Sequence, residues 1–299
     1  MNPAILRMKS ASLVQDEKGP ASVNRFPQTR QTLIQRIATD RQAPEWNTFL
    51  DDYWGPVVRF AIRSGNLKIQ DAEDITAETF KTLFTADLLS RWLEDRRSRL
   101  STMLCVVVRN LISNRARLQS GREKIMHELK PVLTAEIARR QRDPAEDRFY
   151  EAWAESLLQS TLLQLQQDYL KRGRVNAFRV FYGRVREGLS NSEIADCLNL
   201  KVTDVENHYK RTRGQFTDRL RSDIEEHVRR YGNVDDFAQE VAWEWQTLGE
   251  YLKTHGDLES VFRQLPSESE ELRCRERESK ADLLQQLTSF IDRKTEQHD

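Results

Sequence analysis

The chain has 299 residues, with 47 Lys or Arg against 47 Asp or Glu, so its formal charge at pH 7 is zero. With only 11 Gly and 8 Pro it has too few turn-forming residues for an all-β fold, and its hydrophobic share of 38% favours small helical units over one thick core. Apolar runs such as Met103 to Val108 are far shorter than the ~20 residues of a membrane span, and no signal-peptide pattern is present, so we expect an all-α cytoplasmic protein.

The helical pattern divides the chain into two small domains joined by a linker and followed by a helical extension. The predicted boundaries are a flexible N-terminal tail over 1–27, a first domain over 28–122, a linker over 123–146, a second domain over 147–231 and an acidic C-terminal extension over 232–299. In the first domain, apolar residues at spacings of three and four predict helices after Thr29, Pro44 and Asp71 and over 101–117. In the second domain the same periodicity begins near Asp147.

Residues 188–213 have the pattern of two helices separated by a tight turn. Ser190 and Glu193 form a capping-box arrangement at the start of the first helix. Asn199 stands where a left-handed residue can end that helix, and Thr203 can cap the second one. This spacing predicts a helix-turn-helix.

The second helix of the pair carries a row of polar and basic side chains that we expect to face outward. Its candidate DNA-binding residues are Thr203, Asn207, His208, Lys210, Arg211 and Arg213. Amide, imidazole and basic groups in such a row suit base edges and phosphates in a major groove. The alternative is an ordinary helical hairpin with a polar surface.

The zero net charge is the sum of two opposed parts. Residues 232–299 contain 16 acidic and 8 basic residues, a net charge of −8, so residues 1–231 carry +8. Within that basic part, Leu88–Lys124 has nine basic against three acidic residues and is a candidate phosphate-facing surface. A solvated helix face is the simpler alternative for a charge run of this kind.

The extension contains amphipathic stretches over 237–252 and 283–291, and such stretches need a partner. We expect them to pack on the second domain for stability. The alternatives are that the extension recruits a regulator, or that its negative charge covers the basic DNA-binding surface as an intramolecular brake.

Three segments carry a combined pattern: Asp71–Phe80 (DAEDITAETF), Arg99–Arg117 (RLSTMLCVVVRNLISNRAR) and Gly188–Arg213 (GLSNSEIADCLNLKVTDVENHYKRTR). In this order and spacing they resemble the sigma-70 family of RNA polymerase sigma factors, particularly the extracytoplasmic-function (ECF) group. The linker and the extra C-terminal extension are most similar to the sigma-like proteins of planctomycetes. The first segment resembles the family's core-polymerase-binding helix, the second its minus-ten helix and the third its promoter-binding helix-turn-helix.

The resemblance implies an adapter that binds core RNA polymerase, at the β′ clamp and the β flap, and directs it to promoter DNA. The core-polymerase-binding residues that it implies are Asp71, Asp74, Glu78 and Phe80. Those for minus-ten DNA are Arg99, Arg109, Asn110, Asn114 and Arg117, and those for minus-thirty-five DNA are the row in residues 203–213. The segment Leu88–Ser98, which contains Trp92, corresponds to the loop that traps a flipped base in the family, although we favour a core position for Trp92.

No catalytic role is predicted. The histidines show no metal or triad spacing, and no phosphate-binding loop or Ser nucleophile motif occurs, so we expect no enzyme activity, no metal and no cofactor. The main prediction is a transcription initiation factor, for which the family also suggests an anti-sigma factor as a partner. The alternative is a helix-turn-helix transcriptional regulator that acts on duplex DNA without core-polymerase binding. A third interpretation is a helical interaction module.

Overall fold

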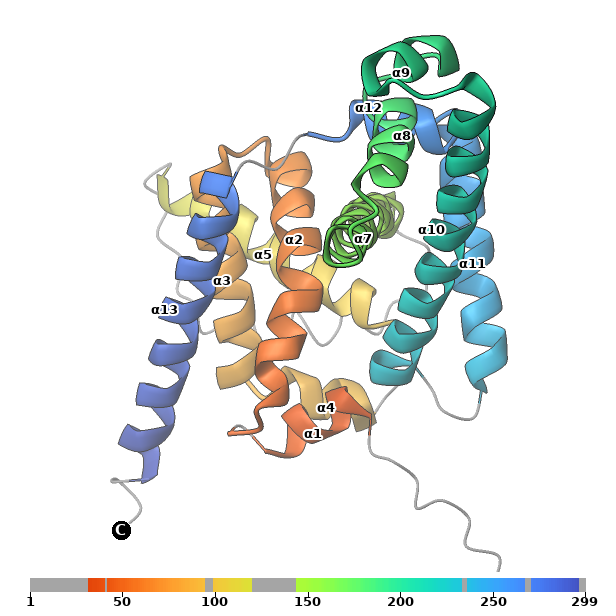
Figure 1. Ribbon diagram of the computed structural model, residues 1–299. Helices are drawn as coiled ribbons and strands as arrows, with labels where there is room; N and C mark the ends of the chain where they lie inside the picture. The colour runs from red at the N-terminus through yellow and green to blue at the C-terminus, as the bar shows by residue number, and fades with distance from the viewer. Residues whose placement is uncertain are drawn as a thin grey trace, which may run out of the picture. The chain divides into compact units, whose positions relative to one another are not determined.

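The computed structural model describes residues 32–40, 42–94, 99–119, 144–232, 236–266 and 270–295, which form twelve helices and no strand (Figure 1). The predicted all-α fold is therefore confirmed. The predicted tail over 1–27 and nearly all of the linker over 123–146 lie outside the described residues. Among the described helices, none combines the length and the apolar character that crossing a membrane requires.

The first part of the chain packs five helices around a cluster of aromatic side chains. They are α1 (Leu33–Thr39), α2 (Glu45–Gly65), α3 (Ile69–Thr85), α4 (Leu88–Glu94) and α5 (Leu100–Gln119). Trp54 of α2 stacks on Phe80 of α3, with ring centroids 6.0 Å apart, and Phe49 meets the same ring edge-on. Trp92 of α4 is buried in this cluster, which confirms the core interpretation of that residue.

The second part contains the predicted helix-turn-helix. Its helices are α7 (Pro144–Lys171), α8 (Val175–Val185), α9 (Asn191–Leu198) and α10 (Val202–Tyr231). A second apolar cluster joins α7, α8 and α10, with Phe181 and Phe216 fully buried in it. At ~1.5 Å per residue, α10 is about 45 Å long, and only its first turns belong to the helix-turn-helix.

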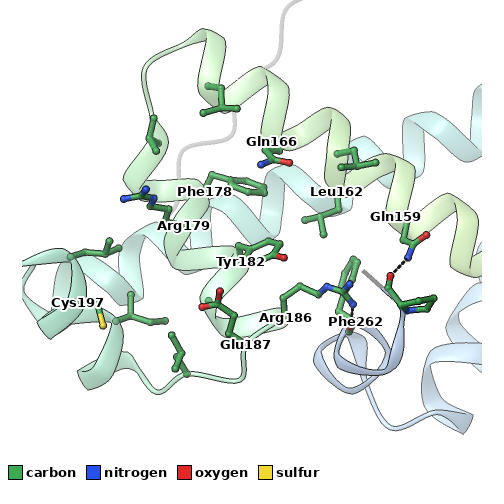
Figure 2. A pocket seen from close by; sticks show the side chains of 18 of the residues that line it. Gln159, Leu162, Gln166, Phe178, Arg179, Tyr182, Arg186, Glu187, Cys197 and Phe262 are labelled. Carbon is green, nitrogen blue, oxygen red and sulfur yellow. Dashed lines mark hydrogen bonds between the residues drawn. The ribbon is translucent and has the colours of Figure 1, made fainter. Parts of the chain in front are cut away.

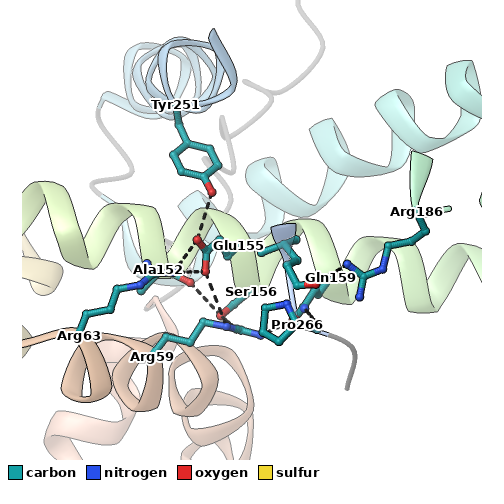
Figure 3. A network of polar contacts seen from close by, with 10 residues as sticks. Arg59, Arg63, Ala152, Glu155, Ser156, Gln159, Arg186, Tyr251 and Pro266 are labelled. Carbon is teal, nitrogen blue, oxygen red and sulfur yellow. Dashed lines mark hydrogen bonds and ion pairs between the residues drawn. The ribbon is translucent and has the colours of Figure 1, made fainter. Parts of the chain in front are cut away.

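Helices from the two predicted domains share an extensive polar and apolar interface, so the division into two domains is not confirmed. Glu155 of α7 accepts hydrogen bonds from Arg63 of α2, at 2.5 and 2.6 Å, and from Tyr251 of the extension at 3.2 Å (Figure 3). Arg59 of α2 donates to Ser156 and Gln159 of α7. The described helices belong to one compact unit.

The far end of α10 is fixed to α2 by a carboxylate. Asp52 accepts hydrogen bonds from the Arg230 guanidinium, at 2.7 and 3.0 Å, and from the Tyr231 hydroxyl at 2.6 Å. These bonds attach the C-terminal end of the helix to the first five helices. The orientation of α10 is therefore set by both parts of the chain.

The described helices of the extension pack on the rest of the chain. It forms α11 (Phe237–Thr254), α12 (Leu258–Gln264) and α13 (Glu270–Thr295). Helix α11 packs on α7 and α10, and α12 packs on α8, with Phe262 fully buried. Helix α13 instead lies on α3. The predicted packing on the second part of the chain thus holds for α11 and α12, whereas α13 packs on the first.

Candidate nucleic-acid interface

The predicted capping box at the start of α9 is present. The Glu193 backbone N–H donates to Ser190 Oγ at 3.2 Å, and the Ser190 N–H donates to Glu193 Oε2 at 2.7 Å. These hydrogen bonds lower the pKa of the exposed Glu193 carboxyl. Because two backbone donors are satisfied reciprocally, the first turn of α9 begins at a defined residue.

The turn between α9 and α10 is a Schellman motif. Asn199 is left-handed, with φ 52° and ψ 49°, as predicted. The Leu200 N–H donates to the Ala195 carbonyl at 2.9 Å, which is the six-to-one bond of the motif. Leu200 thereby packs against the small apolar cluster that contains Ile194 and Val205. This packing joins α9 to the start of α10.

The predicted cap at Thr203 is wrong. The N-cap of α10 is Lys201, whose backbone is extended and whose side chain makes no capping hydrogen bond, so the helix already begins at Val202. The reason lies in the short turn, which leaves only Asn199, Leu200 and Lys201 between the two helices. Thr203 is instead an exposed residue of the first helical turn.

The outward face of α10 carries the predicted row. Thr203, Asn207, Lys210, Arg211 and Arg213 are exposed, and His208 is half-buried. The opposite face is held in place: Tyr209 donates to Glu259 of α12, and the Tyr169 hydroxyl donates to the buried Thr212 at 3.2 Å. The basic row is therefore presented on a helix that cannot easily rotate.

The candidate minus-ten residues of α5 are spread along one helix. Arg109 and Arg117 are exposed, while Asn110 and Asn114 are half-buried. The Asn110 Nδ2 atom is buried and makes no hydrogen bond among the described residues.

Arg99, just before α5, contacts the extension, although its side chain stays 45% exposed. Its guanidinium carbon lies 3.3 Å above the ring centroid of Trp243, and its Nη1 lies 3.7 Å from Glu244 Oε1. Both partners belong to α11. An Arg side chain can stack on a nucleic-acid base and pair with a phosphate. Here the Trp243 ring and the Glu244 carboxylate take the places of those two partners.

The candidate polymerase-binding residues of α3 fall into two groups. Asp74 and Glu78 have well-exposed carboxylates, and Asp71 pairs with Arg115 of α5, which also reaches Asp74 at 3.4 Å. Phe80 is fully buried in the first apolar cluster. Its direct effect is therefore on the packing of α3, and the carboxylates form the surface.

The sequence pattern did not predict Arg115, the partner of Asp71 and Asp74, or Trp243 and Glu244, the partners of Arg99. Each contact joins segments at least 40 residues apart, so no local spacing could identify it. The only available signal was the high aromatic content of the predicted extension helix, which indicated a packed face without naming its target.

A cavity of about 580 Å³ lies behind the helix-turn-helix, between α7, α8 and α9 (Figure 2). Leu162, Phe178 and Tyr182 provide much of its apolar wall, and Phe262 and Pro266 of the extension lie at one side. The cavity is distinct from the outward basic row of α10.

Comparison of the chain with models of protein families, with curated proteins and with solved structures finds no match.

Proposed function

We propose that the protein is a sigma factor of the sigma-70 type, which binds core RNA polymerase and directs promoter recognition for transcription initiation. The observation that carries the proposal is the helix-turn-helix, with its capping box at Ser190, its Schellman turn at Asn199 and an exposed basic row at the start of α10. Side chains at the N-terminal end of a recognition helix are those that enter a major groove.

Two further features support the proposal. The exposed carboxylates of Asp74 and Glu78 are available on α3 for a basic partner surface, which we assign to the β′ clamp. The apolar cavity between α7, α8 and α9 is large enough for side chains of a second segment, which we assign to the β flap.

The DNA-binding part of the proposal predicts a salt-dependent contribution from the basic row. K210A/R211A should weaken promoter binding and reduce the slope of log affinity against log salt by ~2, because each phosphate contact contributes about 1. R221A is the matched control, because Arg221 is an exposed arginine of the same helix that pairs with Glu225 outside the row. Fluorescence anisotropy on promoter duplexes at several salt concentrations measures this, and equal slopes for both variants would contradict the assignment.

The polymerase-binding part predicts that carboxylates on α3 are needed. D74N/E78Q should reduce binding to core RNA polymerase and abolish transcription from a promoter library, whereas D218N, at an exposed site on α10, should not. DNA binding that persists without any polymerase binding would favour the alternative, a helix-turn-helix regulator of duplex DNA.

A further inference from the structure

Helix α13 covers one face of α3. In Figure 1 it runs beside α3 at the outer edge of the first group of helices. Leu283 and Leu287 are buried in the apolar cluster of α2, α3 and α5, and Leu284 is partly buried against it. Over 273–289, the part of α13 whose side chains are described, the other side chains are mainly polar, so these leucines supply most of the apolar contact there.

At this contact the signs are the reverse of the net charges of the two parts, +8 for residues 1–231 and −8 for the extension. Arg275 of α13 lies 3.0 Å from Glu73 of α3, and Lys280 lies 2.9 Å from Asp51 of α2. An extension with a net charge of −8 thus places basic side chains on carboxylates of the basic part. The surface on α2 and α3 therefore recognises a helix with basic residues and leucines on one face.

The fit of α13 on this surface is incomplete. A cavity of about 280 Å³ lies between the helices where Glu73, Asp74 and Ala77 face Arg275 and its neighbours. A second cavity of about 360 Å³ lies further along, near Thr85. Both hollows are open to solvent, so α13 covers this side of α3 only in part. The contact is therefore one that a better-fitting helix can replace.

We propose that α13 is an intramolecular competitor of core RNA polymerase for the face of α3 that carries Glu73, Asp74 and Ala77. This inference rests on the proposed function, because it requires that α3 binds the polymerase. Glu73 is only 12% exposed and pairs with Arg275, so a partner that contacts Glu73 together with the neighbouring Asp74 must displace α13. The displacing element is a helix with basic and leucine side chains, the chemistry that α13 itself presents.

The test uses full-length variants altered on α13 alone, which leaves α3 intact. R275Q/K280Q removes both cross-helix ion pairs, and R277Q removes an exposed charge of the same helix as a control. L283D/L287D removes the buried leucines and releases α13 if the charge changes are too small. Hydrogen exchange of the α13 amides measures release, and binding to core RNA polymerase is measured in parallel.

We expect R275Q/K280Q to speed exchange in α13 and to tighten polymerase binding by ~3- to 10-fold over the wild type, with a larger gain for L283D/L287D and none for R277Q. Released α13 with unchanged or weaker polymerase binding would overturn the inference and leave the proposed function standing. Slow α13 exchange even in L283D/L287D would also overturn it. Absence of polymerase binding by every form, including those with α13 released, would instead refute the proposed function and the inference together.

Discussion

Replacing Glu244 by Gln should stabilise the protein at pH 8 and leave its stability unchanged near pH 4. Glu244 of α11 has a side chain only 12% exposed, and its Oε2 makes no hydrogen bond among the described residues. Burial raises the pKa of Glu244 from 4.5 to about 7, against the opposing effects of Arg99 and Tyr150, while Glu240 adds to the rise. The folded protein therefore holds a proton on this carboxyl at pH values where the unfolded chain has lost it.

The magnitude follows from the linkage between protonation and folding. A rise in pKa from 4.5 to about 7 corresponds to about 3 kcal/mol against the charged form. The stabilising contribution of the protonated Glu244 is fully present below pH 4.5 and is lost as the pH rises through about 7. Gln resembles the protonated carboxyl in shape and has no charge, so E244Q should gain about 3 kcal/mol over the wild type above pH 7.

Urea denaturation of both proteins at a series of pH values measures the difference. E250Q is the control, because Glu250 is an exposed residue of the same helix and its substitution should change stability by less than about 0.5 kcal/mol. A free energy of unfolding for E244Q that is lower than that of the wild type at pH 8 would refute the reasoning. So would a difference that is the same at pH 4 and pH 8.

Three other predictions follow from buried or capping groups. Burial, with Arg230 nearby, lowers the pKa of His227 from 6.5 to about 3, so wild-type stability is lost as the pH falls below 6.5. Relative to the wild type, H227L should therefore gain ~1.4 kcal/mol per pH unit below 6.5 in the same denaturation series, and a parallel pH dependence would contradict this. S190A removes the capping box of α9 and should cost about 1 kcal/mol, whereas an unchanged midpoint would argue against the cap. F262A empties a fully buried site beneath α12 and should cost ~3–5 kcal/mol by thermal or urea unfolding; a cost below about 1 kcal/mol would show that α12 is not a packed part of the fold.

Local features were predicted well because their causes lie within a few residues. The capping box at Ser190 and the left-handed Asn199 each depend on one side chain and the backbone of its own turn. The helices of both parts follow from apolar spacing in the same way. The local error at Thr203 arose because α10 begins earlier, with Lys201 as its N-cap, although the Lys201 side chain makes no capping hydrogen bond.

Long-range contacts could not be predicted from spacing. Asp52 binds Arg230 across more than 170 residues, and Glu155 joins α2, α7 and α11. The predicted division into two domains missed these contacts, because a charged residue on a helix face looks the same whether it meets solvent or another helix. Such polar side chains, once buried together, fix one arrangement of helices because an unpaired buried charge is costly.

The net charges of the two parts of the chain do not predict the sign of each contact between them. The acidic Glu244 of α11 meets the basic Arg99, as a brake on DNA binding requires, but α13 brings the basic Arg275 to the acidic Glu73. Removing the whole extension would therefore release Arg99, proposed to face DNA, and Glu73, on the proposed polymerase-binding face, at once. Their effects on promoter affinity and on polymerase affinity would be mixed in a single measurement. E244Q alters only the contact with Arg99, and R275Q/K280Q alters only ion pairs of α13. The two variants therefore separate the effect of the extension on promoter affinity from its effect on polymerase affinity, which its net charge of −8 does not distinguish.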